Sequence, residues 1–455
     1  IDIKAIFFSP QAGILEISRA ETELMENLQE LGYEVVRIGC NGFMSQVCAV
    51  MSAARVNFSS TNEQKNNVCK SCKIAQAALT RGLKSKKIFL EDILTVSETN
   101  EVEVLLRNID LSNWQEFEID GVPIGKYASY EFLLEHKIDP TKLDINNWLQ
   151  YVTHLRYCVV VYFGTKKLIQ IEKPDVAVVY NYLYSINHAF ESAMTKQGIP
   201  TYSIHGGMDF RYIEETLSVS QGIAVILRAS RSESWSKART VALNKDEISQ
   251  VYKNQKFLLK GKSFGTYSRA VTKKDKAKIR KEYNIGDEQK VIVCATSSPD
   301  EMAASALVVN DLTSSTITRS IYVDQIEWLK DVIDIATRRP DYFILIRIHP
   351  REFPNKRDNI KSEHAQKLES SLINLPQNVQ VVWPIRNESI YDLMKITQLL
   401  LTGISSVGGE FLALGIPVIC HESEKLNAYP SECIKSLSNR ESYEDLIDST
   451  LGENV

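Results

Sequence analysis

The sequence predicts an α/β protein of two domains, each a β/α series on a mostly parallel sheet, with the two domains facing a cleft. Three observations support this fold class. Short apolar runs alternate with helix-period segments in both halves of the chain, which implies parallel strands joined by crossover helices. A segment poor in apolar runs, Asn244 to Asp287, separates the two series. The chain of 455 residues is also longer than a domain with a single hydrophobic core usually is.

The first series fills the N-terminal half. The spacing of its apolar residues alternates between the pattern typical of strands and the pattern typical of helices. We expect strands at Ile3–Phe8, Tyr33–Ile38, Lys87–Leu90, Val176–Tyr180 and Pro200–Ile204. We expect helices at Ile14–Leu31, Asn62–Arg81 and Ser185–Gln197. These elements predict an N-terminal domain over residues 1–260, followed by a linker over residues 261–287.

The second series fills residues 288–455, which we assign to a C-terminal domain. We expect strands at Lys290–Thr296, Tyr342–Ile348, Val379–Trp383, Gln398–Thr402 and Pro417–Cys420. We expect helices at Ile326–Thr337, Lys361–Leu372 and Ser389–Ile396. Ligands of open α/β sheets bind at the carboxyl ends of the strands, so motifs at those ends are the candidate sites.

Bulk composition excludes several classes of protein. A net charge of −4 and a pI near 6.1 argue against nucleic acid as a general partner. No apolar run approaches the roughly 18 residues of a membrane span, and Cys158 to Phe163 is the longest. The start of the chain shows no secretory signal pattern, and eight cysteines in that context favour a reducing compartment. We therefore expect a cytoplasmic enzyme.

The most informative motif follows the strand that ends at Thr402. Ser405, Ser406 and Gly408 lie where a strand would turn into a short helix, and Glu410 lies on the first turn of that helix. Small residues at such a turn let backbone N–H groups approach an anion, and the helix N-terminus adds a favourable dipole. A carboxylate at that point suits a ligand with both phosphate and hydroxyl groups. The motif therefore predicts a nucleotide pocket.

A second motif ends the strand that begins at Tyr342. Strand alternation would put Arg347, His349 and Arg351 on one side, with Pro350 stopping the strand. Three converging donors suit a phosphate group. The alternative is a salt-bridged strand edge, since Glu352 is adjacent.

A third motif closes the last clear strand of the first series. His205 is followed by two glycines, so its imidazole could face the cleft and act as a general base near neutral pH. Asp209 is the competing base, or the group that orients His205. The alternative is a histidine satisfied by backbone hydrogen bonds at a turn.

Two further clusters carry weaker signals. Thr296 and Ser297 end the first strand of the second series and could donate to a phosphate, although capping of the next helix is the simpler role. Cys40, Cys48, Cys69 and Cys72 have a Cys-x7-Cys and Cys-x2-Cys spacing within an insert at residues 40–72. Such thiols could hold a structural zinc ion or, less readily, an iron–sulfur cluster. A redox pair or buried thiols are the alternatives.

Taken together, these motifs resemble a known family. Glu410-x4-Gly415-x-Pro417 resembles the acidic motif of GT-B glycosyltransferases, which have two Rossmann-like domains facing a cleft. The order His205-Gly206, His349-Pro350, Ser405-Ser406 is similar to bacterial surface-polysaccharide transferases: capsule Kdo transferases, polysialyltransferases and CDP-glycerol glycerophosphotransferases. The resemblance covers roughly residues 173–422. The acidic-acidic-glycine triplet of bacterial sialyltransferases and an Asp-x-Asp motif are both missing from the sequence.

The resemblance implies the roles of the motif residues. Glu410 would hold the ribose of a nucleotide-activated donor, preferably a CMP-sugar, and His349, Ser405 and Ser406 would hold its phosphate. His205 or Asp209 would be the base toward a capsule, O-antigen or related glycan acceptor, lipid-linked or free. Inversion is favoured because a single base suffices for direct displacement, and no catalytic metal is expected.

Several alternatives stay open at this point. A nucleotide-sugar 2-epimerase shares the architecture, a CDP-glycerol-type reaction would transfer a polyol phosphate, and a non-enzymatic metal-binding scaffold would be built on the cysteines. Association with membrane polysaccharide machinery at the inner face of the inner membrane is a further implication of the resemblance.

Overall fold

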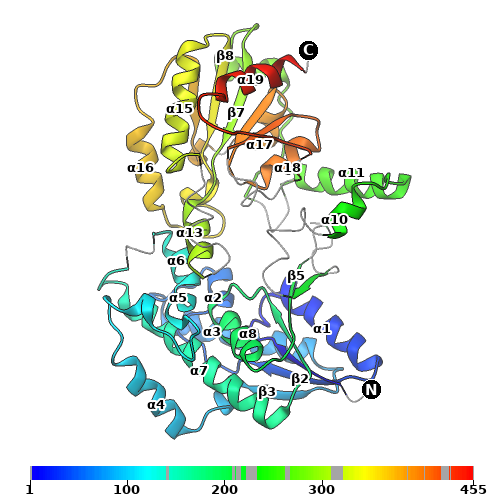
Figure 1. Ribbon diagram of the computed structural model, residues 1–455, viewed down its shortest axis with the longest axis vertical. Coiled ribbons are helices and arrows are strands. Elements are labelled where there is room, and N and C mark those ends of the chain that lie inside the picture. Colours follow the sequence, from blue (N-terminus) through cyan, green and yellow to red (C-terminus); the bar gives the residue numbers. More distant parts are fainter. Residues whose placement is uncertain are drawn as a thin grey trace. The chain divides into compact units, whose positions relative to one another are not determined.

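The computed structural model describes residues 3–139, 143–206, 211, 217–221, 233–261, 267–308, 321–386, 388–403, 405–421, 430 and 432–453. The chain forms two compact units, one of residues 1–225 and 300–311 and the other of residues 226–299 and 312–455. Each unit contains one six-stranded sheet with helices packed on it (Figure 1). The predicted fold class, α/β with two Rossmann-like domains, is confirmed by these two sheets.

The sheet of the first unit has the strand order β3-β2-β1-β4-β5-β6. All its neighbours pair in parallel except β6, which runs antiparallel to β5. The order 3-2-1-4-5 is that of a mononucleotide-binding β/α fold. The strands are β1 Lys4–Phe8, β2 Glu34–Gly39, β3 Lys86–Phe89, β4 Val176–Tyr180, β5 Thr201–Gly206 and β6 Leu217–Gln221.

The helices of the first unit include one long element that the sequence patterns did not predict. The 25-residue α7 is apolar on most of its faces and largely buried, which explains why no amphipathic stripe marked it. The longest apolar run, Cys158 to Phe163, lies within α7, and Cys158 is buried there. The helices are α1 Leu15–Glu30, α2 Ala49–Ala53, α3 Asn62–Leu79, α4 Val96–Leu106, α5 Ile124–Ala128, α6 Tyr130–His136, α7 Trp148–Glu172 and α8 Ser185–Lys196.

The sheet of the second unit has the order β12-β11-β10-β7-β8-β9, and all its neighbours pair in parallel. Every residue of β8 is buried, because helices cover both faces of a parallel sheet. The strands are β7 Lys290–Ala295, β8 Tyr342–Arg347, β9 Val379–Val382, β10 Leu399–Thr402, β11 Val418–Cys420 and β12 Lys435–Ser436.

In the core of the second unit, α15 Gln325–Arg338, α16 Glu363–Ser371 and α19 Tyr443–Gly452 pack around Trp328, whose indole N–H donates to the Tyr443 hydroxyl at 3.1 Å. The other helices of this unit are α10 Glu233–Ala238, α11 Lys245–Leu259, α12 Lys276–Glu282, α17 Ile390–Met394 and α18 Val407–Leu412. A further helix, α13 Pro299–Val308, follows β7, and residues 300–311 belong to the first unit. None of the helices that the structure describes is long and apolar enough to cross a bilayer.

Part of the segment for which we predict a linker is attached to the second unit. The Thr272 N–H donates to the Asp392 carboxylate at 3.1 Å, and the Ser389 hydroxyl donates to the Arg269 carbonyl at 2.9 Å. Asp392 and Ser389 lie at the start of α17. Residues 267–272 are therefore held against the helix that also contributes to the candidate site.

Candidate functional site

The carboxyl ends of three neighbouring strands of the second unit lie side by side. Ala295, the last residue of β7, pairs with Arg347 of β8 on one side and with Thr402 of β10 on the other. The segments that leave these strands carry the Thr296, His349 and Ser405 motifs. Because parallel strands in register end at one edge of a sheet, the three sequence motifs meet at that edge.

Hydrogen bonds fix these three strand ends to one another. The Thr402 hydroxyl donates to the Ala295 carbonyl at 3.0 Å, and the Thr296 N–H donates to the Arg347 carbonyl at 3.1 Å. The His349 N–H in turn donates to Thr296 Oγ1 at 2.8 Å. Thr296 is buried. It therefore has a structural role between β7 and β8, whatever else it binds.

The His-Pro turn differs from the predicted alternation. β8 ends at Arg347, and Pro350–Glu352 forms a single turn of 3₁₀ helix, η5, capped by His349. The expectation that Arg347, His349 and Arg351 share one side of a strand was therefore wrong, because the strand stops before His349. Arg351 and Pro350 lie in the 3₁₀ turn, and Arg351 is buried there.

The imidazole of His349 has a defined orientation. Its Nδ1 accepts a hydrogen bond from the Arg351 N–H at 3.3 Å, and its ring meets the Tyr267 ring edge-on at 5.5 Å between centroids. Since Nδ1 is an acceptor, a neutral His349 ring carries its proton on Nε2. Nε2–H is the kind of donor that a phosphate oxygen accepts.

Arg347 and Glu410 are two buried charges that interact with each other. Burial lowers the pKa of Arg347 to about 10, and the Glu410 carboxylate opposes that shift. Burial also raises the pKa of Glu410, opposed first by Tyr391 and then by Arg347. In the part of the chain that the structure describes, Glu410 Oε2 is buried without a hydrogen-bond partner. A buried carboxylate oxygen in that state is costly unless a ligand supplies a donor.

The remaining residues of the glycine-rich motif lie at the start of α18 and just before it. The Gly408 N–H donates to the Ser405 carbonyl at 3.0 Å, and Ser406 is the exposed N-cap residue, whose side chain forms no capping hydrogen bond. Gly408 is buried, whereas a Cβ on Gly409 would meet no atom within 4 Å. The helix has only six residues, so its dipole is smaller than the motif suggested.

The Glu410-x4-Gly415-x-Pro417 spacing has a structural explanation. Gly415 has φ of +76°, a left-handed conformation that follows the last turn of α18. The Ile416 N–H then donates to the Phe411 carbonyl at 3.0 Å, and Pro417 leads into β11. The motif thus places Glu410 on a helix that is held against two strands of the sheet.

The serine after Thr296 is tied to neighbouring segments. The Ser297 N–H donates to Gln325 Oε1 at 2.7 Å. The next residue, Ser298, donates to the buried Glu352 carboxylate at 3.1 Å, which also accepts from Ser362. Two hydroxyl groups thus contact the Glu352 carboxylate beside the His-Pro turn.

His205 lies in the first unit, on β5. Its ring stacks on that of Tyr180 with centroids 5.3 Å apart, and its Nδ1 lies 3.1 Å from the Gly206 carbonyl oxygen. A carbonyl only accepts, so Nδ1 carries the proton and Nε2 of the neutral ring is left as the basic nitrogen. This arrangement suits a general base. Asp209, the competing base, lies outside the described residues.

The four cysteines do not form the metal site that their spacing suggested. Among the described residues, no group of three or more Cys, His, Asp or Glu side chains is placed to hold a metal ion. Cys69 and Cys72 lie on α3, whereas Cys48 is the N-cap residue of α2 and Cys40 follows β2. Burial raises the pKa of Cys40 to about 11 and of Cys48 to about 12. All four are partly buried, and none of them forms a disulfide.

Sequence reasoning missed residues that complete the site. Tyr391 on α17 interacts with Glu410 and Arg347 and is buried. Tyr267 holds His349 from one side and accepts a hydrogen bond from Arg357 Nη1 at 3.1 Å. Neither tyrosine belongs to a recognisable motif. In the sequence, Tyr391 is marked only by its position in the predicted helix Ser389–Ile396, and Tyr267 only by its position in the predicted linker.

No protein-family model and no curated protein matches the sequence. One similar solved structure is the β-Kdo 2,4 transferase KpsC of Thermosulfurimonas dismutans, with 15% identity over 59% of this chain and 75% of that chain and a TM-score of 0.38. Another is the UDP-GlcNAc 2-epimerase of Methanocaldococcus jannaschii in complex with UDP-GlcNAc and UDP, with 12% identity, 99% and 93% coverage and a TM-score of 0.34.

A third is the UDP-GlcNAc 2-epimerase of Neisseria meningitidis bound to UDP-GlcNAc, with 13% identity, 100% and 92% coverage and a TM-score of 0.31. A β-Kdo transferase and UDP-GlcNAc 2-epimerases are thus among the structures that this chain resembles. Likenesses of this size do not establish an activity, since one fold serves many reactions.

Proposed function

We propose that the chain is a glycosyltransferase that moves a sugar from a nucleotide-activated donor, preferably a CMP-sugar, to a bacterial capsule, O-antigen or related surface glycan. The buried Glu410 oxygen without a hydrogen-bond partner among the described residues carries this proposal. A ribose hydroxyl would supply the donor that this oxygen needs. Arg347 beside it keeps a charged carboxylate tolerable in a buried position.

The donor phosphate would occupy the same strand-end edge. His349 Nε2–H, Arg347 and the backbone and hydroxyl groups at Ser405 and Ser406 are the donors proposed for it, with Thr296, Ser297, Gly408, Pro350 and Arg351 shaping the pocket. Negative charge develops on the departing phosphate, so fixed donors aimed at it would lower the barrier. No catalytic metal is required for this arrangement.

The acceptor hydroxyl would lose its proton to a base of the first unit. His205 presents an unprotonated Nε2 in its neutral form, which supports it over Asp209 as the proposed base. A single base is sufficient for direct displacement, so we propose inversion at the anomeric carbon. We propose that the protein acts in the cytoplasm, next to the inner face of the inner membrane.

Thermal-shift measurements with CMP, CDP, UDP, GDP and dTDP test the donor site. A bound nucleotide stabilises the native state by mass action. A nucleotide at about 100 times its Kd adds roughly 2.7 kcal/mol to the free energy of unfolding. The correct nucleotide should raise the melting temperature of the native protein, and the increase should shrink in Glu410→Gln. No shift with any of the five would overturn the proposed site.

Incubation with a sugar nucleotide alone separates the transferase from its rivals. A transferase leaves the sugar configuration intact until an acceptor is added. Isomerised nucleotide sugar without acceptor would instead establish a 2-epimerase. Release of CMP from CDP-glycerol, but from no CMP-sugar, would establish a polyol-phosphate transferase.

A further inference from the structure

Helix α11 presents an apolar face that the second unit leaves uncovered. Ile248, Val251 and Tyr252 have the i, i+3, i+4 spacing of one helix face, and they are 54%, 49% and 64% exposed. Asn244 caps the helix by accepting from the N–H groups of Asp246 and Glu247, so the helix has a defined start. Exposed apolar residues are ordinary singly, but a contiguous stripe indicates an interaction surface.

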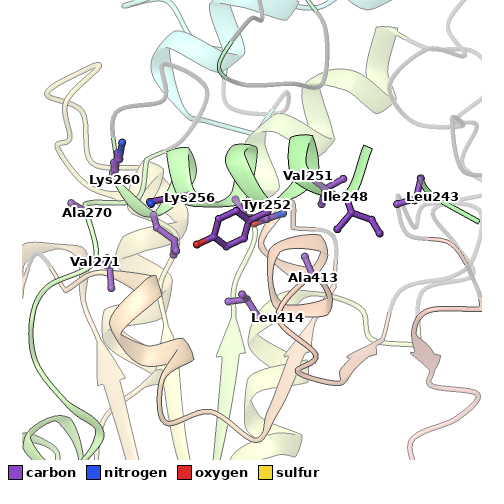
Figure 2. Close-up of a pocket in the computed structure, with 12 residues that line it drawn as sticks. Leu243, Ile248, Val251, Tyr252, Lys256, Lys260, Ala270, Val271, Ala413 and Leu414 are labelled. Atoms are coloured by element: carbon purple, nitrogen blue, oxygen red, sulfur yellow. The ribbon is translucent and has the colours of Figure 1, made fainter. Parts of the chain in front are cut away.

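The apolar face borders a groove of about 780 Å³ within the same unit. Ala413 and Leu414, which follow α18, lie across this groove from Val251 and Tyr252 (Figure 2). Leu414 is itself exposed, and Val271 extends the same apolar lining. The ribbon shows α11 at the edge of its unit, away from the sheet (Figure 1). The surface is therefore open along one side.

A stripe of lysines runs beside the apolar face. At about 100° per residue, Lys245, Lys256 and Lys260 fall on one flank of the helix, next to the apolar residues, and Lys253 lies just beyond them. All four are exposed. Their ammonium groups have no ion-pair partner among the described residues. The chain as a whole carries a net charge of −4, so this positive stripe is a local feature.

We propose that the α11 face, defined by Ile248, Val251, Tyr252 and the flanking lysines, docks onto an anionic lipid bilayer. Interfacial helices combine an apolar face, buried in the boundary between headgroups and acyl chains, with lysines on the adjoining face. Tyrosine is favoured at that boundary. The four lysines would meet anionic headgroups, each strengthening the attraction.

The lysines beside the apolar face argue against a second copy of the chain as the partner that covers the α11 face. Two copies joined through this face would bring two lysine stripes together at the rim of the contact, where like charges repel. An anionic bilayer offers complementary charge and an apolar interior at the same surface. The proposal concerns α11 alone and does not depend on the proposed activity, because none of these residues belongs to the Glu410 site.

Vesicle co-sedimentation tests the proposal with the full chain. Vesicles of pure phosphatidylcholine are compared with vesicles in which a third of the lipid is phosphatidylglycerol, at low and high salt. The variants are Val251→Asp and the double variant K256E/K260E. Matched controls on the same unit are the exposed Ile373→Asp and the exposed Lys278→Glu of α12. Thermal melts check that each variant is folded.

The wild type should partition onto the anionic vesicles and dissociate as salt rises, because exposed charges are screened. K256E/K260E should bind at least about ten-fold more weakly, and Val251→Asp should lose binding at every salt concentration. The two controls should bind like the wild type. Absence of wild-type binding, unchanged binding of both variants, or a wild-type dimer that Val251→Asp dissociates would each overturn the proposal.

Discussion

The guanidinium of Arg347 and the carboxylate of Glu410 are buried together and oppose each other's loss of charge. Arg347 ends β8, and Glu410 lies on α18 after β10, so their proximity depends on the strand order of the second sheet. Breaking such a pair leaves one buried charge uncompensated, which makes it a sensitive point for mutation.

Glu410→Gln should weaken binding of the donor nucleotide at least about ten-fold, because hydrogen bonds to a charged group are worth roughly 1.5–3 kcal/mol. Burial raises the pKa of Glu410, so the wild type should also lose affinity as the pH falls through that raised pKa and the carboxylate is protonated. Calorimetry at several pH values measures both effects. A glutamine variant with wild-type affinity and the same pH dependence would exclude the ribose role.

His349→Ala should reduce kcat/KM for the donor at least about ten-fold, equivalent to about 1.4 kcal/mol of transition-state stabilisation. His349→Asn is the matched control, since its side-chain oxygen could still accept the Arg351 N–H and cap η5. Steady-state kinetics of the two variants separate the roles. If asparagine restores full activity, His349 serves only as a cap and donates nothing to phosphate.

His205→Ala should lower the rate and remove the acidic limb of the pH–rate profile, because a neutral Nε2 is the proposed base. Profiles of kcat/KM for the acceptor, recorded with both proteins, provide the measurement. The same acidic limb in the alanine variant would transfer the role to another group, with Asp209 the first candidate.

Gly415→Ala should lower the free energy of unfolding by about 1 kcal/mol, because φ of +76° strains any residue with a Cβ. The matched control is Gly409→Ala, at a helical position where the added Cβ meets nothing within 4 Å. That substitution should be neutral or slightly stabilising. Urea unfolding of both variants gives the comparison, and equal losses would contradict the strain argument.

Glu21 should make stability depend on pH. Its burial raises the pKa from 4.5 to about 7, so the native state binds the proton more tightly than the unfolded state. The carboxyl therefore favours folding fully below about pH 4.5, and that contribution is lost as the pH rises to about 7. Glu21→Gln should flatten this part of the stability profile. Denaturant midpoints of both proteins, measured between pH 4 and 8, test this prediction. If the midpoint of the glutamine variant changes with pH as steeply as that of the wild type, Glu21 is not the group responsible.

Local patterns were sufficient to predict most strands. β4 lies at the predicted residues, and β1 and β8 differ from the predictions by one terminal residue. Buried parallel strands are short, continuous apolar runs followed by turns, so the chain shows them directly. α7 was missed because a helix that is buried on most of its faces has no amphipathic period.

The sequence by itself determined the β/α alternation and the strand-end position of each motif. The tertiary structure decided which distant groups meet: Arg347 with Glu410, Tyr391 beside both, and Tyr267 against His349. It also left the four cysteines, whose spacing had suggested a metal site, without a group of three ligands among the described residues. The physical reason is that spacing encodes only contacts along one helix or strand, whereas strand order and packing set the contacts between elements.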